Sequence, residues 1–329
     1  MKRALFHRYG NPVDVIEVVE EADPIPGAGE VRVRNSVMTI NPADLLSMEG
    51  HYGSEIRSLP ATPGMGAYGV VDAIGRCVTR LAVGDAVLPV GTGLWADTVI
   101  LKEGMALKAP FGVNPEQAAL MRANPGTAYL MLTDIVRLQP GDWIVQNAAN
   151  SNVGRMVIRF AREMGLHTAN IVRRNDVAEA LKADGADAVI VDEGQDVAAA
   201  IAQVVQALPK LALDAVGGKM TSALGSVLAN RGTVVTYGLL SGQPSEVNAR
   251  DTVFRDIRLR GFWLFDWYQT APLDKIRALH EFLEKKLTQG MLQTDIDARY
   301  PLAQVKVAVA HAARGGRNGK ILLTGESNA

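Results

Sequence analysis

Residues 146–174 read QNAANSNVGRMVIRFAREMGLHTANIVRR, and this stretch decides the fold. Apolar side chains recur on one helical face at Val153, Met156, Val157, Phe160, Ala161 and Met164. Gly165 follows at the position where a glycine ends a helix. Short apolar runs precede and follow the helix, so the stretch predicts a strand, a helix over 153–164 and a second strand.

The loop between the first strand and the helix, residues 147–152, consists of small and polar side chains. Such a loop can bring backbone N–H groups and a helix N-terminus to a pyrophosphate, although it lacks most of the usual glycines. On the loop alone, a cofactor site and a phosphate-free turn are about equally compatible with the sequence.

Two arginines at the end of the second strand favour a cofactor. Sites for NAD usually have an acidic residue at this position, which binds the ribose 2′-hydroxyl. Arg173 and Arg174 would instead suit a 2′-phosphate, and Asp176 lies close by in the sequence. The alternative is a solvated strand end. Loop and arginines together predict NADPH rather than NADH.

Composition limits the class of protein. The chain has 329 residues, which suggests about two domains, and a formal net charge of -1 gives no reason to expect a nucleic-acid or membrane partner. Cys77 is the only cysteine, which excludes a disulfide framework and a cysteine-rich zinc site. The start of the sequence lacks a signal-peptide core, and no apolar run reaches the ~20 residues of a membrane span. We therefore expect a cytoplasmic protein.

The organisation changes near residue 112. Before it the sequence is rich in strands and turns, as in 27–37, where Val31 and Val33 share one face. After it, strands alternate with helices, which predicts a doubly wound parallel sheet. The C-terminal part contains an amphipathic helix over 274–288 and a final strand, KILLTG.

Several segments resemble one known family. Residues 126–158, GTAYLMLTDIVRLQPGDWIVQNAANSNVGRMVI, are similar to the medium-chain dehydrogenase/reductase superfamily, in particular its zinc-free 2-enoyl thioester reductase branch. TINPADLLSMEGHYG (39–53), LALDAVGGK (211–219) and GTVVTYG (232–238) resemble the same branch in the same order. The resemblance implies an α/β fold with a β-rich GroES-like catalytic domain, 1–112 and 265–329, and an inserted doubly wound Rossmann domain, 113–264.

The resemblance also implies an activity. Members of the branch use NADPH to reduce the 2,3 double bond of an enoyl thioester in fatty acid metabolism, with hydride to the β-carbon and a proton to the α-carbon. They need no metal, and here Gly64-Met65-Gly66-Ala67 replaces the Gly-His-Glu signature of their zinc-binding relatives. A homodimer is implied as well.

Individual roles carry over onto matching positions. Tyr52 matches the proton donor. The implied cofactor contacts are Asn124 near the nicotinamide, Asn150, Ser151, Asn152 and Val153 at the pyrophosphate, Arg173 and Arg174 at the 2′-phosphate, and Tyr237, Gly238, Phe262, Trp263 and Lys320 elsewhere. Asn152 and Leu239 stand where the family usually has glycine, which bears on cofactor affinity.

Other interpretations of the sequence remain open. An NADPH-dependent quinone or enone reductase would share the fold and cofactor but would not need Tyr52. A non-enzymatic NADPH-binding protein is a further alternative. Arg314 and Arg317 could meet the phosphates of a CoA or carrier-protein thioester, or could be an ordinary solvated charge cluster.

Overall fold

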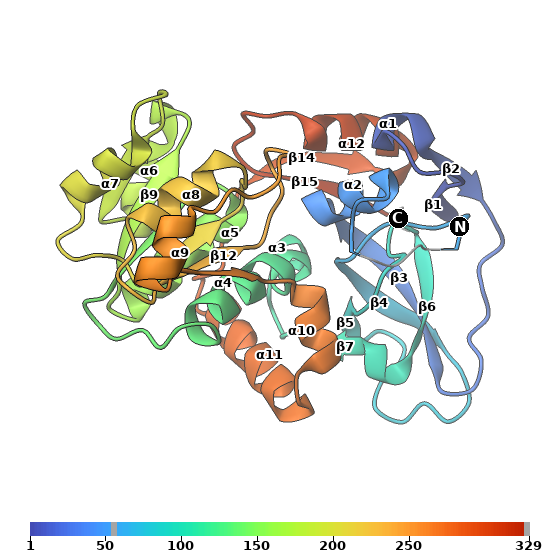
Figure 1. The fold of residues 1–329 in the computed structure, drawn as a ribbon. Helices are drawn as coiled ribbons and strands as arrows, with labels where there is room; N and C mark the ends of the chain where they lie inside the picture. The colour runs from blue at the N-terminus through green and yellow to red at the C-terminus, as the bar shows by residue number, and fades with distance from the viewer. Residues whose placement is uncertain (54–57, 326–329) are drawn as a thin grey trace. The chain divides into compact units, whose positions relative to one another are not determined.

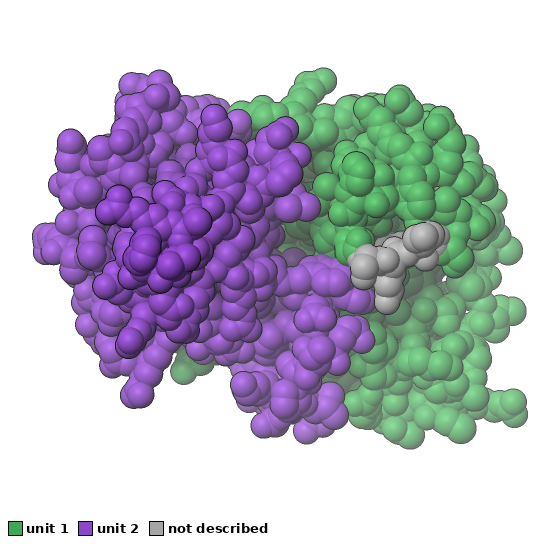
Figure 2. Space-filling model, in the orientation of Figure 1, with its two compact units in different colours: residues 1–122, 284–329 green, residues 123–283 purple. Residues whose placement is uncertain are grey.

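A computed structural model describes residues 1–53 and 58–325, which belong to two compact units. The first unit contains residues 1–122 and 284–329, and the second contains residues 123–283 (Figure 2). A segment from each end of the chain thus contributes to the first unit, and the second unit is one continuous insertion.

The limits of the units differ from the predicted domain limits at 112/113 and 264/265. Helix α3 (Pro115–Leu120) belongs to the first unit because Ala119 and Leu120 join Val37 of its sheet in one apolar cluster. Helix α10 (Leu264–Thr270) lies against α4 (Ala123–Thr133) and belongs to the second. Packing between distant segments, which local sequence patterns do not report, places both limits further along the chain.

The first unit is built on a seven-stranded sheet. Its elements are β1 (Lys2–Phe6), α1 (Pro12–Val15), β2 (Ile16–Glu20), β3 (Glu30–Thr39), α2 (Pro42–Glu49), β4 (Ala67–Ile74), β5 (Ala86–Pro89), β6 (Thr98–Lys102), η1 (Glu103–Met105), β7 (Ala106–Lys108), α3, β14 (Ile296–Pro301), η3 (Leu302–Gln304), α12 (Val305–Ala313) and β15 (Lys320–Thr324). The order β14-β15-β3-β4-β5-β7, with β6 also paired to β3, joins the C-terminal strands to the N-terminal ones (Figure 1). Strands β1 and β2 form a separate antiparallel pair.

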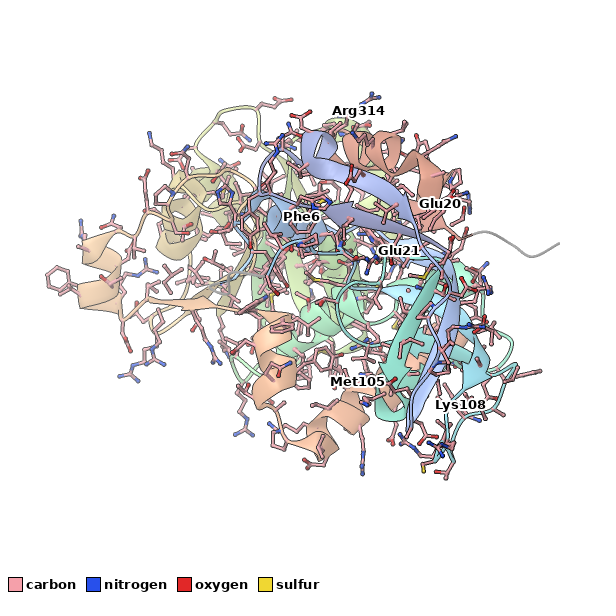
Figure 3. All side chains as sticks on the ribbon, turned by 90° about the vertical axis from the view of Figure 1, so that its right-hand side faces the viewer. Phe6, Glu20, Glu21, Met105, Lys108 and Arg314 are labelled. Carbon is pink, nitrogen blue, oxygen red and sulfur yellow. The ribbon has the colours of Figure 1, made fainter. Side chains whose placement is uncertain are left out.

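The core of the first unit follows from strand alternation. Val31 and Val33 are both fully buried, as the period-two pattern predicts. Phe6 points into the same core (Figure 3), together with Trp95, whose indole Nε1 donates to the carbonyl of Thr39 at 2.9 Å. The indole N–H is thus satisfied inside an apolar cluster, as a buried tryptophan requires.

The second unit is a parallel six-stranded sheet between helices. Its elements are α4, β8 (Trp143–Gln146), α5 (Asn152–Glu163), β9 (His167–Val172), η2 (Asn175–Val177), α6 (Ala178–Asp184), β10 (Ala188–Val191), α7 (Val197–Val204), β11 (Leu211–Asp214), α8 (Lys219–Ser226), β12 (Thr233–Thr236), α9 (Ala249–Arg255), β13 (Arg258–Gly261), α10 and most of α11 (Leu273–Thr288). The strand order is β10-β9-β8-β11-β12-β13. Counted along the unit this is 3-2-1-4-5-6, the order of a Rossmann fold, so the predicted fold class is confirmed.

The helices of the second unit cover both faces of its sheet. Ile158 of α5 and Leu181 of α6 pack with Val172 in one cluster, whereas Ile201 of α7 and Leu224 of α8 belong to another. Helix α5 begins one residue before the predicted start, and Gly165 beyond it has φ +70°, as a helix-ending glycine should. In the described part of the chain no helix is long and apolar enough to cross a membrane.

Candidate cofactor and proton-donor site

The candidate cofactor site lies in the second unit, where the strand order reverses between β8 and β11. Ligands of open α/β sheets bind beyond the carboxyl ends of the strands at such a switch point. The loop that follows β8, residues 147–151, begins at this switch point. Its first residue still pairs with β11, since the Asn147 N–H donates to the carbonyl of Leu213 at 3.2 Å. The sequence therefore placed its candidate pyrophosphate loop at the position where a Rossmann fold binds its ligand.

Buried hydrogen bonds hold this loop against the turn after β11. The Asn147 side chain donates to Asp214 Oδ1 at 2.7 Å and accepts from the Ala215 N–H at 2.7 Å. Asp214 is fully buried and also accepts from the Gly217 N–H at 2.9 Å and from the Thr221 hydroxyl at 2.6 Å. The segment LALDAVGGK gives Asp214 no role by itself, although an aspartate at the end of a strand and shortly before two glycines is the signal that points to it.

The helix N-terminus beyond the loop is capped by the loop itself. Ser151 is the N-cap of α5, and its hydroxyl accepts from the Gly154 N–H at 3.1 Å. Ala148 has φ +47°, so one residue of the loop adopts the left-handed region. A Cβ on Gly154 would lie 2.5 Å from the carbonyl oxygen of Ala149, so the close approach of loop and helix requires a glycine there.

A second glycine, Gly238, lets the turn after β12 approach the turn after β11. A Cβ on Gly238 would lie 2.6 Å from the Ala215 carbonyl oxygen. Next to it, burial raises the pKa of the Tyr237 phenol above its ordinary value, the nearby Ser151 side chain opposes the shift, and the charge of Asp214 adds to it. The phenol thus keeps its proton at neutral pH. Because Ser151 influences this pKa, Tyr237 lies close to the loop of residues 147–151 within the second unit.

Two further polar groups bear on whether a nicotinamide cofactor fits. Among the described residues, neither Asn124 Nδ2 nor Thr236 Oγ1 has a hydrogen-bond partner, although both atoms are buried. Buried donors left unpaired cost free energy, about 1–3 kcal/mol each, and a bound molecule would satisfy them. Together with the close approach of loop, helix and turn that Gly154 and Gly238 allow, these atoms fit a dinucleotide.

The two predicted 2′-phosphate residues differ in their surroundings. The Arg173 side chain, at the end of β9, is exposed and has no ion-pair partner among the residues described. Arg174 lies with Nε 3.5 Å from Asp176 Oδ1, so part of its charge is already compensated. Arg173 is therefore the better candidate for the phosphate contact, and Asp176 competes for the other arginine.

We expect Arg173→Gln to raise the KM for NADPH about 10- to 100-fold and to leave the KM for NADH unchanged, because a charge-assisted hydrogen bond contributes about 1.5–3 kcal/mol. Steady-state kinetics with both cofactors measures this. Arg137→Gln is the matched control, since Arg137 is an exposed arginine of the same unit. Equal losses with NADPH and NADH would contradict a role at the 2′-phosphate.

Phe262 and Trp263, also predicted to contact the cofactor, follow the edge strand β13. The Phe262 N–H donates to the Thr236 carbonyl at 3.0 Å, which continues the pairing with β12 one residue past the end of β13. Trp263 is half-buried and packs on Phe265 with ring centroids 5.2 Å apart. Neither ring is enclosed in the core, so both remain candidates for a ligand contact.

The predicted proton donor lies in the first unit, just beyond α2. Asn41 caps this helix together with Asp44, whose carboxylate accepts from the Asn41 N–H at 2.7 Å. Gly50, with φ +78°, ends it, and the half-buried Tyr52 follows two residues later. Tyr52 is thus held on a short connection to a helix that is capped at both ends.

The first unit also contains Lys320, a predicted cofactor contact. Its side chain is buried at the start of β15, and Nζ donates to Asn41 Oδ1 at 2.6 Å. Burial lowers the pKa of Lys320 to about 8, Asp44 opposes this shift, and Arg317 adds to it. The sequence did not reveal this link between β15 and the N-terminus of the helix that leads to Tyr52.

We expect the buried Lys320 to make the protein more stable as the pH rises from about 8 to 10.5. Below pH 8 the lysine is charged in both states and its burial cost is present in full. Above its folded pKa of about 8 the folded protein releases the proton, whereas the unfolded chain keeps it up to the ordinary 10.5. The difference corresponds to about 3 kcal/mol at most.

Urea unfolding between pH 7 and 10.5 measures this effect. Lys320→Met should lack the rise, because it removes the titrating group while keeping the apolar stem. The same rise in wild type and variant would show that another group causes it.

Side chains that could bind a metal ion do not gather in the described residues. The described residues contain no group of three or more histidine, cysteine, aspartate or glutamate side chains that could hold a metal ion. In the segment that replaces the Gly-His-Glu signature, Gly66 stands at the position of the glutamate, and a Cβ there would lie 2.6 Å from Thr39 Oγ1.

Comparison with known proteins identifies the family. Residues 27–111 match the alcohol dehydrogenase GroES-like domain, and residues 152–283 match the domain described as zinc-binding dehydrogenase. The human mitochondrial enoyl-(acyl-carrier-protein) reductase is 34% identical over 98% of this chain and 88% of its own length. The chain belongs to the medium-chain dehydrogenase/reductase superfamily, in its enoyl thioester reductase branch.

Solved structures from the superfamily agree with this membership. A putative NADPH:quinone reductase from Bacillus thuringiensis is 29% identical, with a TM-score of 0.91 and 99% coverage of both chains. The mitochondrial 2-enoyl thioester reductase Etr1p of Candida tropicalis, solved as an Etr1p/Etr2p heterodimer and with NADP and crotonyl-CoA, is 25% identical. Both Etr1p structures have a TM-score of 0.85 and cover 98% of this chain and 99% of their own. The resemblance stated from residues 126–158 is thereby confirmed.

Proposed function

We propose that the protein is an NADPH-dependent enoyl thioester reductase that saturates the 2,3 double bond of an enoyl-CoA or enoyl-carrier-protein substrate. The observation that carries this proposal is the 34% identity to the human enoyl-(acyl-carrier-protein) reductase over nearly the whole chain. The switch-point loop, the unpaired Asn124 and Thr236 atoms and the exposed Arg173 support the cofactor.

One group of residues would bind the cofactor, and Tyr52 would transfer the proton. NADPH, when bound, supplies the hydride for the β-carbon. The Ser151-capped loop and the N-terminus of α5 provide backbone N–H groups for the pyrophosphate, and Arg173 provides a cation for the 2′-phosphate. Tyr52 holds the proton that the α-carbon receives, and the capped helix α2 sets the position from which its connection starts.

Turnover with matched substrates tests the proposal. NADPH oxidation is followed with a medium-chain trans-2-enoyl-CoA, and in parallel with NADH and with a small quinone. We expect turnover of the enoyl-CoA with NADPH. Quinone turnover without enoyl-CoA turnover would instead support the second candidate, a quinone reductase, which the 0.91 TM-score to the Bacillus thuringiensis protein favours.

We further propose that two copies pair through the exposed edge of the Rossmann sheet. All four residues of β13, Arg258–Gly261, are exposed, and β13 is the edge strand of the sheet. Beside it, Val253 and Phe254 of α9 are 70% and 79% exposed, and Leu259 of β13 is 44% exposed. An unpaired edge flanked by apolar side chains is a template for strand pairing with a second chain.

Phe254→Asp is expected to convert the dimer into a monomer at micromolar concentration, because it places a charge in the apolar part of the proposed interface. Sedimentation velocity measures the mass. Phe111→Asp is the control, since Phe111 is fully exposed but belongs to the first unit. A monomeric wild type, or an unchanged mass for Phe254→Asp, would refute the pairing.

We propose a cytoplasmic location, supported by a chain whose single cysteine, Cys77, is exposed and unpaired. The human relative is named as a mitochondrial protein, so a mitochondrial location is the alternative outcome. Cell fractionation with detection of the native chain distinguishes the two.

A further inference from the structure

A hollow in the first unit lies among residues with no part in the proposed reaction. Its volume is about 230 Å³, and it is lined by Asp297 of β14, His311 of α12 and the turn of residues 314–318 that leads to β15. Arg314 lies at the surface beside α12 (Figure 3). The hollow has room for several waters, each of which occupies about 30 Å³, and therefore for a small polar group.

The charges around the hollow are predominantly positive. Arg314 and Arg317 both line it, and in the described ranges no carboxylate lies within ion-pair distance of either guanidinium. The one carboxylate in the lining, Asp297, has Oδ2 3.1 Å from His311 Nε2. Two cations therefore face one anion that is already engaged, and the hollow has a net charge of at least +1 with His311 neutral (two minus one).

Arg317 is held in place without being neutralised. Its side chain is half-buried, and this burial lowers its pKa, which only the charge of Asp297 opposes. Nε donates to the Arg314 carbonyl at 3.0 Å and Nη1 to the Gly319 carbonyl at 3.4 Å. A guanidinium has five N–H groups, so three remain for a ligand. Main-chain acceptors thus orient the guanidinium, while no carboxylate of the described residues lies within ion-pair distance of it.

His311 is satisfied on both sides in its neutral form. Nδ1 lies 2.9 Å from the Tyr300 hydroxyl and Nε2 faces Asp297. The imidazole can accept from the phenol and donate to the carboxylate, which keeps Asp297 occupied away from the arginines. Asp297 therefore acts on Arg317 only from beyond ion-pair distance, while it pairs directly with His311.

The C-terminal end of α12 explains why a cation lies at Arg314, but it does not explain the one at Arg317. A cation at a helix C-terminus stabilises the helix dipole, and Arg314 is the C-cap residue of α12. Arg317 lies three residues beyond this and is half-buried, where an unpaired charge costs more than at the surface. A guanidinium pair matches the oxygens of a phosphate, with bidentate geometry and full charge.

We infer that this hollow binds a phosphate monoester group through Arg317 and Arg314. The group has two possible sources, the 3′-phosphate of a CoA thioester or a separate phosphate compound. The first source rests on the proposed function, whereas the binding itself does not. Because the test measures binding and not turnover, failure of this inference and failure of the proposed reaction give different results.

Isothermal titration calorimetry of the full chain, saturated beforehand with NADP⁺, tests the inference with three probes: CoA, dephospho-CoA and inorganic phosphate. We expect wild type to bind CoA at least tenfold more tightly than dephospho-CoA, and Arg314→Gln/Arg317→Gln to lose this preference. Arg76→Gln is the control, since Arg76 is an exposed arginine of the same unit. Melting temperatures show whether the variants are folded, and Arg314→Gln alone, at an exposed position, replaces the double variant if it is not.

The outcomes separate the sources. A CoA preference that disappears in the variant supports the 3′-phosphate. Equal binding of CoA and dephospho-CoA, with phosphate binding that the variant loses, supports the hollow with a separate phosphate compound as its ligand. If the variant binds all three probes as wild type does, the inference is wrong.

Discussion

Tyr52→Phe is expected to lower kcat for enoyl-CoA reduction by about 10²- to 10⁴-fold, the usual contribution of a positioned general acid. The dissociation constant for NADPH should change by less than about twofold, because the predicted cofactor loop belongs to the other unit. Stopped-flow measurement of NADPH oxidation gives kcat, and fluorescence titration gives the NADPH affinity. Phenylalanine keeps the ring and removes only the hydroxyl that carries the proton.

Two comparisons make this result specific. Tyr68→Phe removes a hydroxyl from another half-buried tyrosine of the same unit and should leave kcat unchanged. Quinone reduction by Tyr52→Phe, if wild type shows any, should also persist, since no proton to an α-carbon is needed there. Wild-type enoyl-CoA turnover in Tyr52→Phe would show that another group donates the proton.

Gly154→Ala is expected to destabilise the Rossmann unit by about 1–3 kcal/mol and to weaken NADPH binding at least tenfold, because overpacking displaces the main chain. The added Cβ would lie 2.5 Å from the oxygen, 2.7 Å from the Cα and 2.8 Å from the carbonyl carbon of Ala149, all main-chain atoms. Ala149 is fully buried and its N–H donates to Ile171 at 3.2 Å, so the loop has little room to retreat. Urea unfolding and NADPH titration measure the two effects.

Gly225→Ala is the matched control, a second helical glycine of the same unit. A Cβ there would meet Ile257 Cγ2 at 3.6 Å and Val234 Cγ2 at 3.8 Å, which is ordinary van der Waals contact. Alanine also favours a helix over glycine by up to about 1 kcal/mol, so this variant should be as stable as wild type or more so. Similar losses in both variants would mean that the approach of α5 to Ala149 is not the cause.

The sequence predicted the elements of the fold more closely than the limits of its units. Periodicity placed α5 to within one residue and the long helix α11 to within one residue at its start. The predicted limits put α3 in the Rossmann domain and most of α10 in the catalytic domain, whereas the structure has them the other way round, because these short helices belong to whichever unit their side chains pack against. The alternation at Val31 and Val33 predicted burial correctly, since the direction of each side chain in a strand follows from its neighbours.

The candidate site was predicted in part. Ser151, Arg173 and Tyr237 carry signals that the sequence shows, namely a helix start, a strand end and a family motif. The ion pair between Arg174 and Asp176 makes Arg173 the better candidate for the 2′-phosphate. This pair forms because the turn at η2 brings Asp176 Oδ1 to 3.5 Å from Arg174 Nε. The roles of the predicted site residues stay predictions, which the variants above test.

What the sequence by itself determined are the features that neighbouring residues set: the βαβ unit, the end of α5 at Gly165, and the absence of a cysteine-rich zinc site in a chain with one cysteine. What only the tertiary structure decided are contacts between distant residues. Asn147 and Asp214 are 67 positions apart, and Asn41 and Lys320 are 279 apart. Helical and strand periodicity extends over a few residues, whereas a buried hydrogen bond depends on which strands become neighbours, and the packing of the whole sheet decides that.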